Sequence, residues 1–170
     1  AETLRLFALF EQLTGARVKD VVEEDDRNTF LVEEGQVGKA IGKGALNLQR
    51  LREHLKKDIE IVGYAKDPQQ FVANLFHRFN VESIEWEDRN GDIIAHVKIP
   101  QEDRGKAIGK GGRNIQLVRQ LAKRQVTWLR AMMQPGHDSL SPPERFDCLD
   151  AQLTVRVADR VAHFLDQSSP

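Results

Sequence analysis

The sequence has little cysteine and no long apolar run. Cys148 is the single cysteine among 170 residues, which excludes an internal disulfide framework and fits a reducing compartment. The longest uninterrupted apolar runs span only a few residues, too few for a membrane-spanning helix. No signal peptide is expected, because residues 1–14 have the pattern of an amphipathic helix that carries Glu2, Arg5 and Glu11. We therefore expect a cytoplasmic protein.

A catalytic constellation is also missing from the sequence. The five histidines, at positions 54, 77, 96, 137 and 163, are scattered without the spacing of a metal site. Cys148 has no partner at the level of the sequence, and a lone cysteine is more often a small buried hydrophobe than a nucleophile. Trp86 and Trp128 lie in or beside predicted strands, where packing is the first interpretation and base stacking the alternative. We expect neither an enzyme nor a bound metal or cofactor.

Excess charge of one sign is absent overall but present locally. The formal net charge is −1, from 25 basic and 26 acidic residues. Residues 104–124 nevertheless contain seven basic residues and no acidic one, and residues 36–57 contain six basic residues against Glu53 alone. Segregated charge of this kind creates a local positive field that suits a nucleic-acid partner. Solvated basic helix faces are the simpler alternative.

What the sequence does contain is an internal repeat. Residues 38–49 (GKAIGKGALNLQ) realign with residues 105–116 (GKAIGKGGRNIQ), 67 positions later, with nine of twelve identical. Such agreement indicates a duplicated unit.

The flanks of the two copies repeat as a pattern of elements. In the first copy we expect a helix up to Gly15, strands at 17–22 and 29–32, a short helix before Gly42, a helix at 46–57 and a strand at 59–62. In the second copy we expect a helix opened by Asp67-Pro68 and running to Phe79, strands at 81–86 and 93–99 around the Asn90-Gly91 turn, a helix at 113–124 and a strand at 126–129. The order α-β-β-α-α-β predicts an α+β fold with helices on one face of each small sheet. The predicted domains are 1–64, 65–133 and a tail, 134–170.

The tail has two interpretations. Residues 134–143 are rich in turn formers and predict a linker. The spacing of Leu149, Leu153, Val157, Val161 and Leu165 then predicts an amphipathic helix over about 143–167. Leu153, Val155 and Val157 also alternate, so a strand is the competing prediction. We expect the apolar side of the tail to dock onto the repeats, with a separate protein-binding helix as the alternative.

The glycine-rich segment in each copy has the features of a phosphate site. Glycines between two helices permit a tight turn and a close backbone approach to a ligand. The second helix begins there, so its N–H groups and its dipole favour an anion. Lys43 and Lys110 stand at the loop tips. A Walker-type loop is disfavoured because Ala45 and Gly112 stand where it needs Ser or Thr, and a plain helix–turn–helix corner is the structural alternative.

Ile-Gly-x-Gly-Gly between two helices, in this element order, resembles the type II KH domain. Two such units in tandem, with Leu9–Ala16 near the start and Gly105–Ile115 in the second copy, resemble the archaeal NusA-like transcription factors over about residues 3–125. The resemblance implies binding of single-stranded RNA, with each loop gripping about four nucleotides. It also implies RNA polymerase or other transcription factors as partners, and an influence on elongation or termination. The residues expected to bind RNA are Lys39, Ile41, Gly42, Lys43, Gly44, Ala45, Leu48, Lys106, Ile108, Gly109, Lys110, Gly111, Gly112, Arg113 and Ile115.

One position departs from the KH pattern. Ala45 replaces the last glycine of the first loop. If that position needs positive φ, alanine there costs about 1 kcal/mol or more, or the loop takes another shape. The first copy would then grip RNA less well or serve as packing support. Two further hypotheses stay open at this point: a protein-interaction adaptor built on KH scaffolds, and a ribosome-associated RNA-binding factor.

Overall fold

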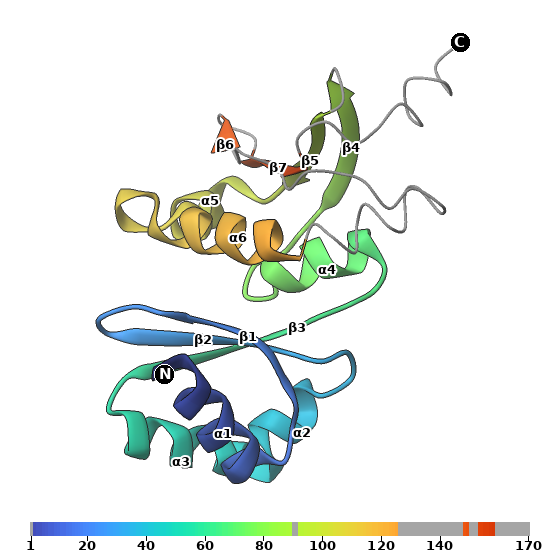
Figure 1. Ribbon diagram of the computed structural model, residues 1–170. Helices are drawn as coiled ribbons and strands as arrows, with labels where there is room; N and C mark the ends of the chain where they lie inside the picture. Colours follow the sequence, from blue (N-terminus) through green and yellow to red (C-terminus); the bar gives the residue numbers. More distant parts are fainter. Residues whose placement is uncertain (1, 90–91, 126–147, 150–152, 159–170) are drawn as a thin grey trace. The chain divides into compact units, whose positions relative to one another are not determined.

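The chain divides into two compact units, residues 1–75 and 76–170. The computed structural model describes residues 2–89, 92–125, 148–149 and 153–158 (Figure 1). None of the helices in these ranges combines the length and the apolar character that crossing a bilayer requires.

The first unit is a three-stranded sheet with helices. Its elements are α1 (Glu2–Thr14), β1 (Val18–Glu23), β2 (Arg27–Val32), α2 (Val37–Ile41), the 3-10 turn η1 (Lys43–Ala45), α3 (Leu46–Leu55), β3 (Asp58–Gly63) and α4 (Pro68–Leu75). The strand order is β1-β2-β3, with β1 antiparallel and β3 parallel to β2. The order α-β-β-α-α-β predicted for the first copy is confirmed.

The second unit carries a four-stranded antiparallel sheet. Its elements are β4 (Ser83–Arg89), β5 (Asp92–Lys98), α5 (Gln101–Ile108), η2 (Lys110–Gly112), α6 (Arg113–Arg124), β6 (Cys148–Leu149) and β7 (Leu153–Ala158). The strand order is β4-β5-β7-β6. The predicted hairpin and the predicted helices on either side of the second glycine-rich loop are confirmed. The strand expected at 126–129 lies outside the described residues.

The core of the first unit lies between its sheet and helices α1, α2 and α3, which cover one face (Figure 1). Phe10 of α1 stacks on Phe30 of β2 with ring centroids 4.4 Å apart. Both rings are fully buried, as is Leu51 of α3. Burying each such side chain contributes about 1.5–3 kcal/mol before entropy is subtracted. This core fixes the two helices that flank the first glycine-rich loop.

Helix α4 packs against β3 of the first unit. The amide of Asn74 donates to the Gly63 carbonyl at 2.9 Å, and the rings of Tyr64 and Phe71 lie 5.6 Å apart. The carboxylate of Asp67 accepts from the backbone N–H groups of residues 69 and 70, at 3.4 and 3.3 Å, which is the predicted helix cap.

The sequence repeat places α4 in the second copy although it contacts the first unit. The boundaries 1–64, 65–133 and 134–170 therefore stay predictions.

The tail prediction is wrong over residues 153–158. These residues form β7, antiparallel to β5 with Ala95 opposite Val155 and His96 opposite Thr154, so the competing strand prediction is confirmed there. The reason is that β5 has an edge to pair with, and β-branched Thr154, Val155 and Val157 suit a pleated strand. As strands, β7 and β6 join the sheet of the second unit. The linker at 134–143 and the rest of the predicted helix lie outside the described residues.

Candidate nucleic-acid interface

The two glycine-rich loops have the same backbone shape. At the first position, φ and ψ are 78° and 166° in Gly42 and 80° and 163° in Gly109. At the third position they are 60° and 26° in Gly44 and 63° and 20° in Gly111. At the fourth position they are 60° and 24° in Ala45 and 76° and 14° in Gly112. Each loop closes on itself, because the N–H of its fourth residue donates to the carbonyl of its first, at 3.1 Å in the first loop and 3.0 Å in the second. Ala45 therefore takes a left-handed conformation, and the first loop keeps the shape of the second.

The first position of each loop has no room for a side chain. A Cβ at Gly42 would lie 2.8 Å from Cγ of Asn47, and one at Gly109 would lie 2.8 Å from the backbone nitrogen of Asn114. Both glycines also have φ near +80°. By contrast, a Cβ at Gly44 or Gly111 would meet nothing within 4 Å. The tight approach at the first glycine brings the preceding and following helices together.

An asparagine in each copy joins those two helices. The amide of Asn47 donates to the Lys39 carbonyl at 3.0 Å, and the amide of Asn114 donates to the Ala107 carbonyl at 2.7 Å. Asn114 is buried, with 5% of its surface exposed. Neither residue was in the predicted site. The signal was present, since both asparagines are among the identical positions of the repeat.

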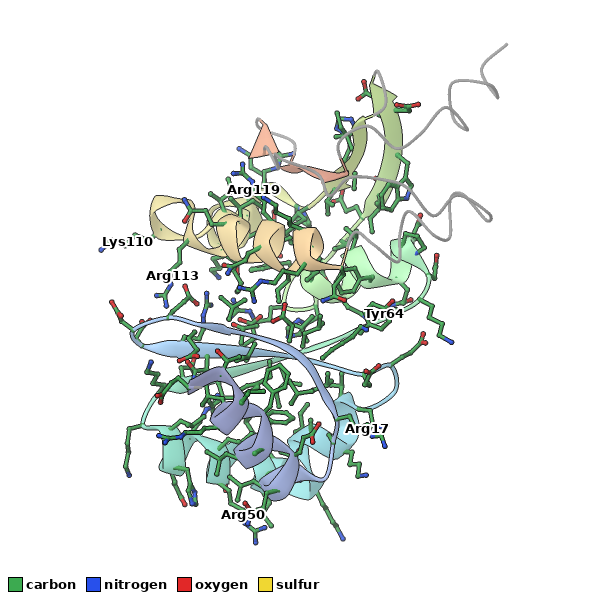
Figure 2. All side chains as sticks on the ribbon, viewed as in Figure 1. Arg17, Arg50, Tyr64, Lys110, Arg113 and Arg119 are labelled. Carbon is green, nitrogen blue, oxygen red and sulfur yellow. The ribbon has the colours of Figure 1, made fainter. Side chains whose placement is uncertain are left out.

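The helices that follow the loops begin without a side-chain cap. Ala45 stands at the N-cap of α3 and Gly112 at that of α6, and neither helix start has a side-chain hydrogen bond. Helix starts of this kind carry partial positive charge and attract anions. Lys43 and Lys110 are exposed at the tips, and Figure 2 shows Lys110 and Arg113 projecting from the loop that opens α6. Each loop thus combines a positive backbone pole with an exposed cation.

Comparisons with known proteins match both loops to KH domains. A KH domain model matches residues 7–81, and a model of the NusA-like second KH domain matches residues 68–128. The probable transcription termination protein NusA of Halococcus morrhuae is 36% identical over 122 residues, which cover 72% of this chain and 87% of that protein. The chain belongs to the NusA-like family of tandem KH-domain proteins. The expected family and the tandem KH fold are confirmed.

A second relative carries the same name, and a solved structure is similar to this NusA-like chain in fold. The probable transcription termination protein NusA of Methanococcus vannielii is 32% identical over 123 residues, which cover 72% of this chain and 71% of that protein. The crystal structure of APE1850 superposes with a TM-score of 0.60 at 38% identity, covering 73% of this chain and 91% of that one.

The basic residues predicted for the KH loops differ in their placement. Lys106 is exposed on α5, and Arg113 is partly buried at the start of α6. Lys39 is exposed, but its side chain passes beside Gly15, where an added Cβ would lie 3.2 Å from Cε and 3.7 Å from Nζ. Its ammonium group therefore lies at the carboxyl end of α1, where the helix dipole favours a cation.

The four aliphatic residues predicted for the KH grooves also differ. Ile41 and Leu48 are partly buried and pack against the core of the first unit. Ile115 is 6% exposed, whereas Ile108 is 37% exposed. Core packing thus accounts for three of the four residues. Base contact stays a prediction and is best supported at Ile108.

Proposed function

We propose that this protein binds single-stranded RNA through the KH loops at residues 42–45 and 109–112, and that it acts in transcription termination or elongation. The observation that carries the proposal is the pair of loops with matching torsion angles, each at the uncapped start of a helix and each with an exposed lysine at its tip. A phosphate suits each loop because an uncapped helix start and an exposed lysine stand next to each other in the chain there.

Single-stranded RNA is the expected ligand because of the way in which a KH loop binds nucleotides. The loop grips the backbone of about four nucleotides, and the bases must be splayed out to reach protein side chains. A paired stem holds its bases inside the helix. Two loops of equal shape then provide two attachment points for unpaired RNA.

The role in transcription rests on the relatives. The relatives from Halococcus morrhuae and Methanococcus vannielii carry the name probable transcription termination protein NusA. By extension, the partners of this protein are nascent RNA and RNA polymerase or other transcription factors, in the cytoplasm. The loops supply the RNA contact, and no described feature favours the adaptor or ribosomal hypothesis over this one.

Charge reversal at the loops tests the proposal. Aspartate at positions 110 and 111 (K110D/G111D) or at 43 and 44 (K43D/G44D) sets carboxylates against the phosphate. A Cβ at Gly44 or Gly111 meets nothing within 4 Å, and aspartate tolerates positive φ better than most residues. Each double variant should lower RNA affinity by about tenfold or more, because phosphate contacts dominate binding. The second loop should lose more, since Arg113 adds charge there whereas Leu46 stands at the matching position of the first loop.

Lys66→Asp is the control for the lysine reversal. Lys66 is exposed and lies outside both loops, so exchanging lysine for aspartate there should change RNA affinity little. Circular dichroism checks that all variants are folded. If folded K43D/G44D and K110D/G111D variants both bind RNA as tightly as the parent protein, the loops are not the RNA site.

A further inference from the structure

Exposed large apolar side chains are few in the part of the chain that the structure describes, and they concentrate at the loops. Three are more than one third exposed: Leu4 at 72%, Leu46 at 47% and Ile108 at 37%. Isolated exposed leucines are ordinary on protein surfaces. Here, however, Leu46 directly follows the first KH loop and Ile108 directly precedes the second. The position of these side chains, more than their exposure, requires an explanation.

Leu46 stands where the second copy has Arg113. The two residues open α3 and α6 with nearly identical torsion angles, −59°, −44° and −55°, −47°. The loops before them also match, so both side chains leave the backbone in the same direction relative to their loop. One copy thus presents an aliphatic group, and the other a guanidinium group, at an equivalent point.

The residues that precede the two loops differ in the opposite sense, because the exposed aliphatic side chain is there in the second copy. Ile41 and Ile108 are equivalent in the repeat, yet Ile41 packs against the core of the first unit while Ile108 is exposed. Each loop therefore has one exposed aliphatic neighbour. In the first loop it follows the glycines, and in the second loop it precedes them.

We propose that Leu46 contacts an unpaired base of RNA held by the first loop. This inference rests on the proposed function, because it requires a phosphate on residues 42–45. Leu46 directly follows that loop and opens α3, so it is the exposed apolar side chain nearest in sequence to a nucleotide gripped there. Covering the apolar face of a base removes leucine surface from water, whereas Arg113 at the matching point of the second loop favours a phosphate oxygen. The two loops then hold their nucleotides differently although their backbones match.

Methyl NMR of the full chain tests the contact directly. The protein is labelled at its leucine methyl groups, and the Leu46 signals are assigned by comparison with Leu46→Ala. Two probes are added in turn: a single-stranded oligouridine, and a strand of the same length with abasic riboses. The Leu46 methyl signals should shift with oligouridine and shift much less with the abasic strand. Leu4 is more exposed, lies on α1 outside both loops, and should be unaffected by either probe.

Affinity measurements supply the second readout. Leu46→Ala should weaken oligouridine binding by about threefold to tenfold without changing the salt dependence, because no charge is lost. Leu4→Ala should bind as the parent protein does. If oligouridine shifts the backbone signals of residues 43–45 but leaves the Leu46 methyls unchanged, Leu46 is no base contact and the loop proposal stands. If oligouridine does not bind at all, the proposed function fails together with this inference.

Discussion

Ala45 and Gly112 occupy the same left-handed conformation at the last position of their loops, with φ of 60° and 76°. An L-residue with a Cβ is disfavoured there by about 1–2 kcal/mol, whereas glycine is not. The first loop keeps the common shape in spite of this strain. The surrounding contacts, including the hydrogen bond from Asn47 to Lys39, stabilise the loop enough to hold alanine in place.

The first prediction is that Ala45→Gly stabilises the protein. Removing the Cβ relieves the strain, although glycine also loosens the unfolded chain, so the net gain in the free energy of unfolding should be up to about 1 kcal/mol. Gly112→Ala should lower it by about the same amount. Chemical denaturation measures both.

Gly38→Ala is the control for this exchange. Gly38 lies in α2, and a Cβ there meets nothing within 4 Å, so alanine should be neutral or mildly stabilising through its helix propensity. A loss of stability in Ala45→Gly would show that the strain at Ala45 is smaller than the entropy that glycine adds to the unfolded chain.

The second prediction concerns Tyr64, the only tyrosine in the chain. Burial, followed by the charges of Glu33 and Glu34, raises the pKa of Tyr64 from 10.0 to about 12. Absorbance near 295 nm, the region of tyrosinate absorption, should therefore show one phenol titrating well above pH 10. A midpoint near 10 in the folded protein would contradict the burial of Tyr64 beside Glu33 and Glu34.

The same shift has a consequence for stability. Between pH 10 and about 12 the folded protein keeps the phenol proton while the unfolded chain releases it. The unfolded state then binds fewer protons, so this group's contribution to stability is present below pH 10 and is lost as pH rises through that window. Tyr64→Phe should lose less stability than the parent protein over the same range. Equal slopes would exclude Tyr64 as the source.

Much of the fold could be predicted from the repeat, because local pattern decides most of it. Phe10 lies in the helix predicted before Gly15 and Phe30 lies in the strand predicted at 29–32, and the two rings stack in the core. Residues 153–158 could not be decided, since apolar residues there fit a helix and a strand alike. The choice depended on pairing with β5, a tertiary contact that periodicity does not report.

The loops could be predicted and their surroundings only in part. The glycines and the tip lysines were evident from the repeat. Ile41 and Ile108 are identical in sequence context but differ in burial, because burial depends on what the rest of each unit places beside them. Leu46 was not among the predicted residues, because an aliphatic residue on a helix is normally assigned to the core.

The third prediction is that the tail stabilises the second unit as strands. Ending the chain at Met133 removes β6 and β7, so β5 loses the strand that pairs with it over residues 93–97. The thermal midpoint should fall by several degrees, while RNA affinity stays nearly unchanged because the loops are intact. Val155→Pro, which removes a backbone donor from β7 opposite Ala95, should reproduce part of the loss. An unaltered midpoint in both variants would mean that the β5–β7 pairing contributes nothing to stability.

The measurement closest to the central claim compares single-stranded RNA with a duplex of the same sequence over a salt series. If Lys43, Lys110 and Arg113 each neutralise one phosphate, the logarithm of affinity should fall with the logarithm of salt at a slope of about −2. The account predicts that the single strand binds with this dependence and that the duplex binds far more weakly. Equal affinity for the duplex, or an affinity that does not change with salt, would contradict it.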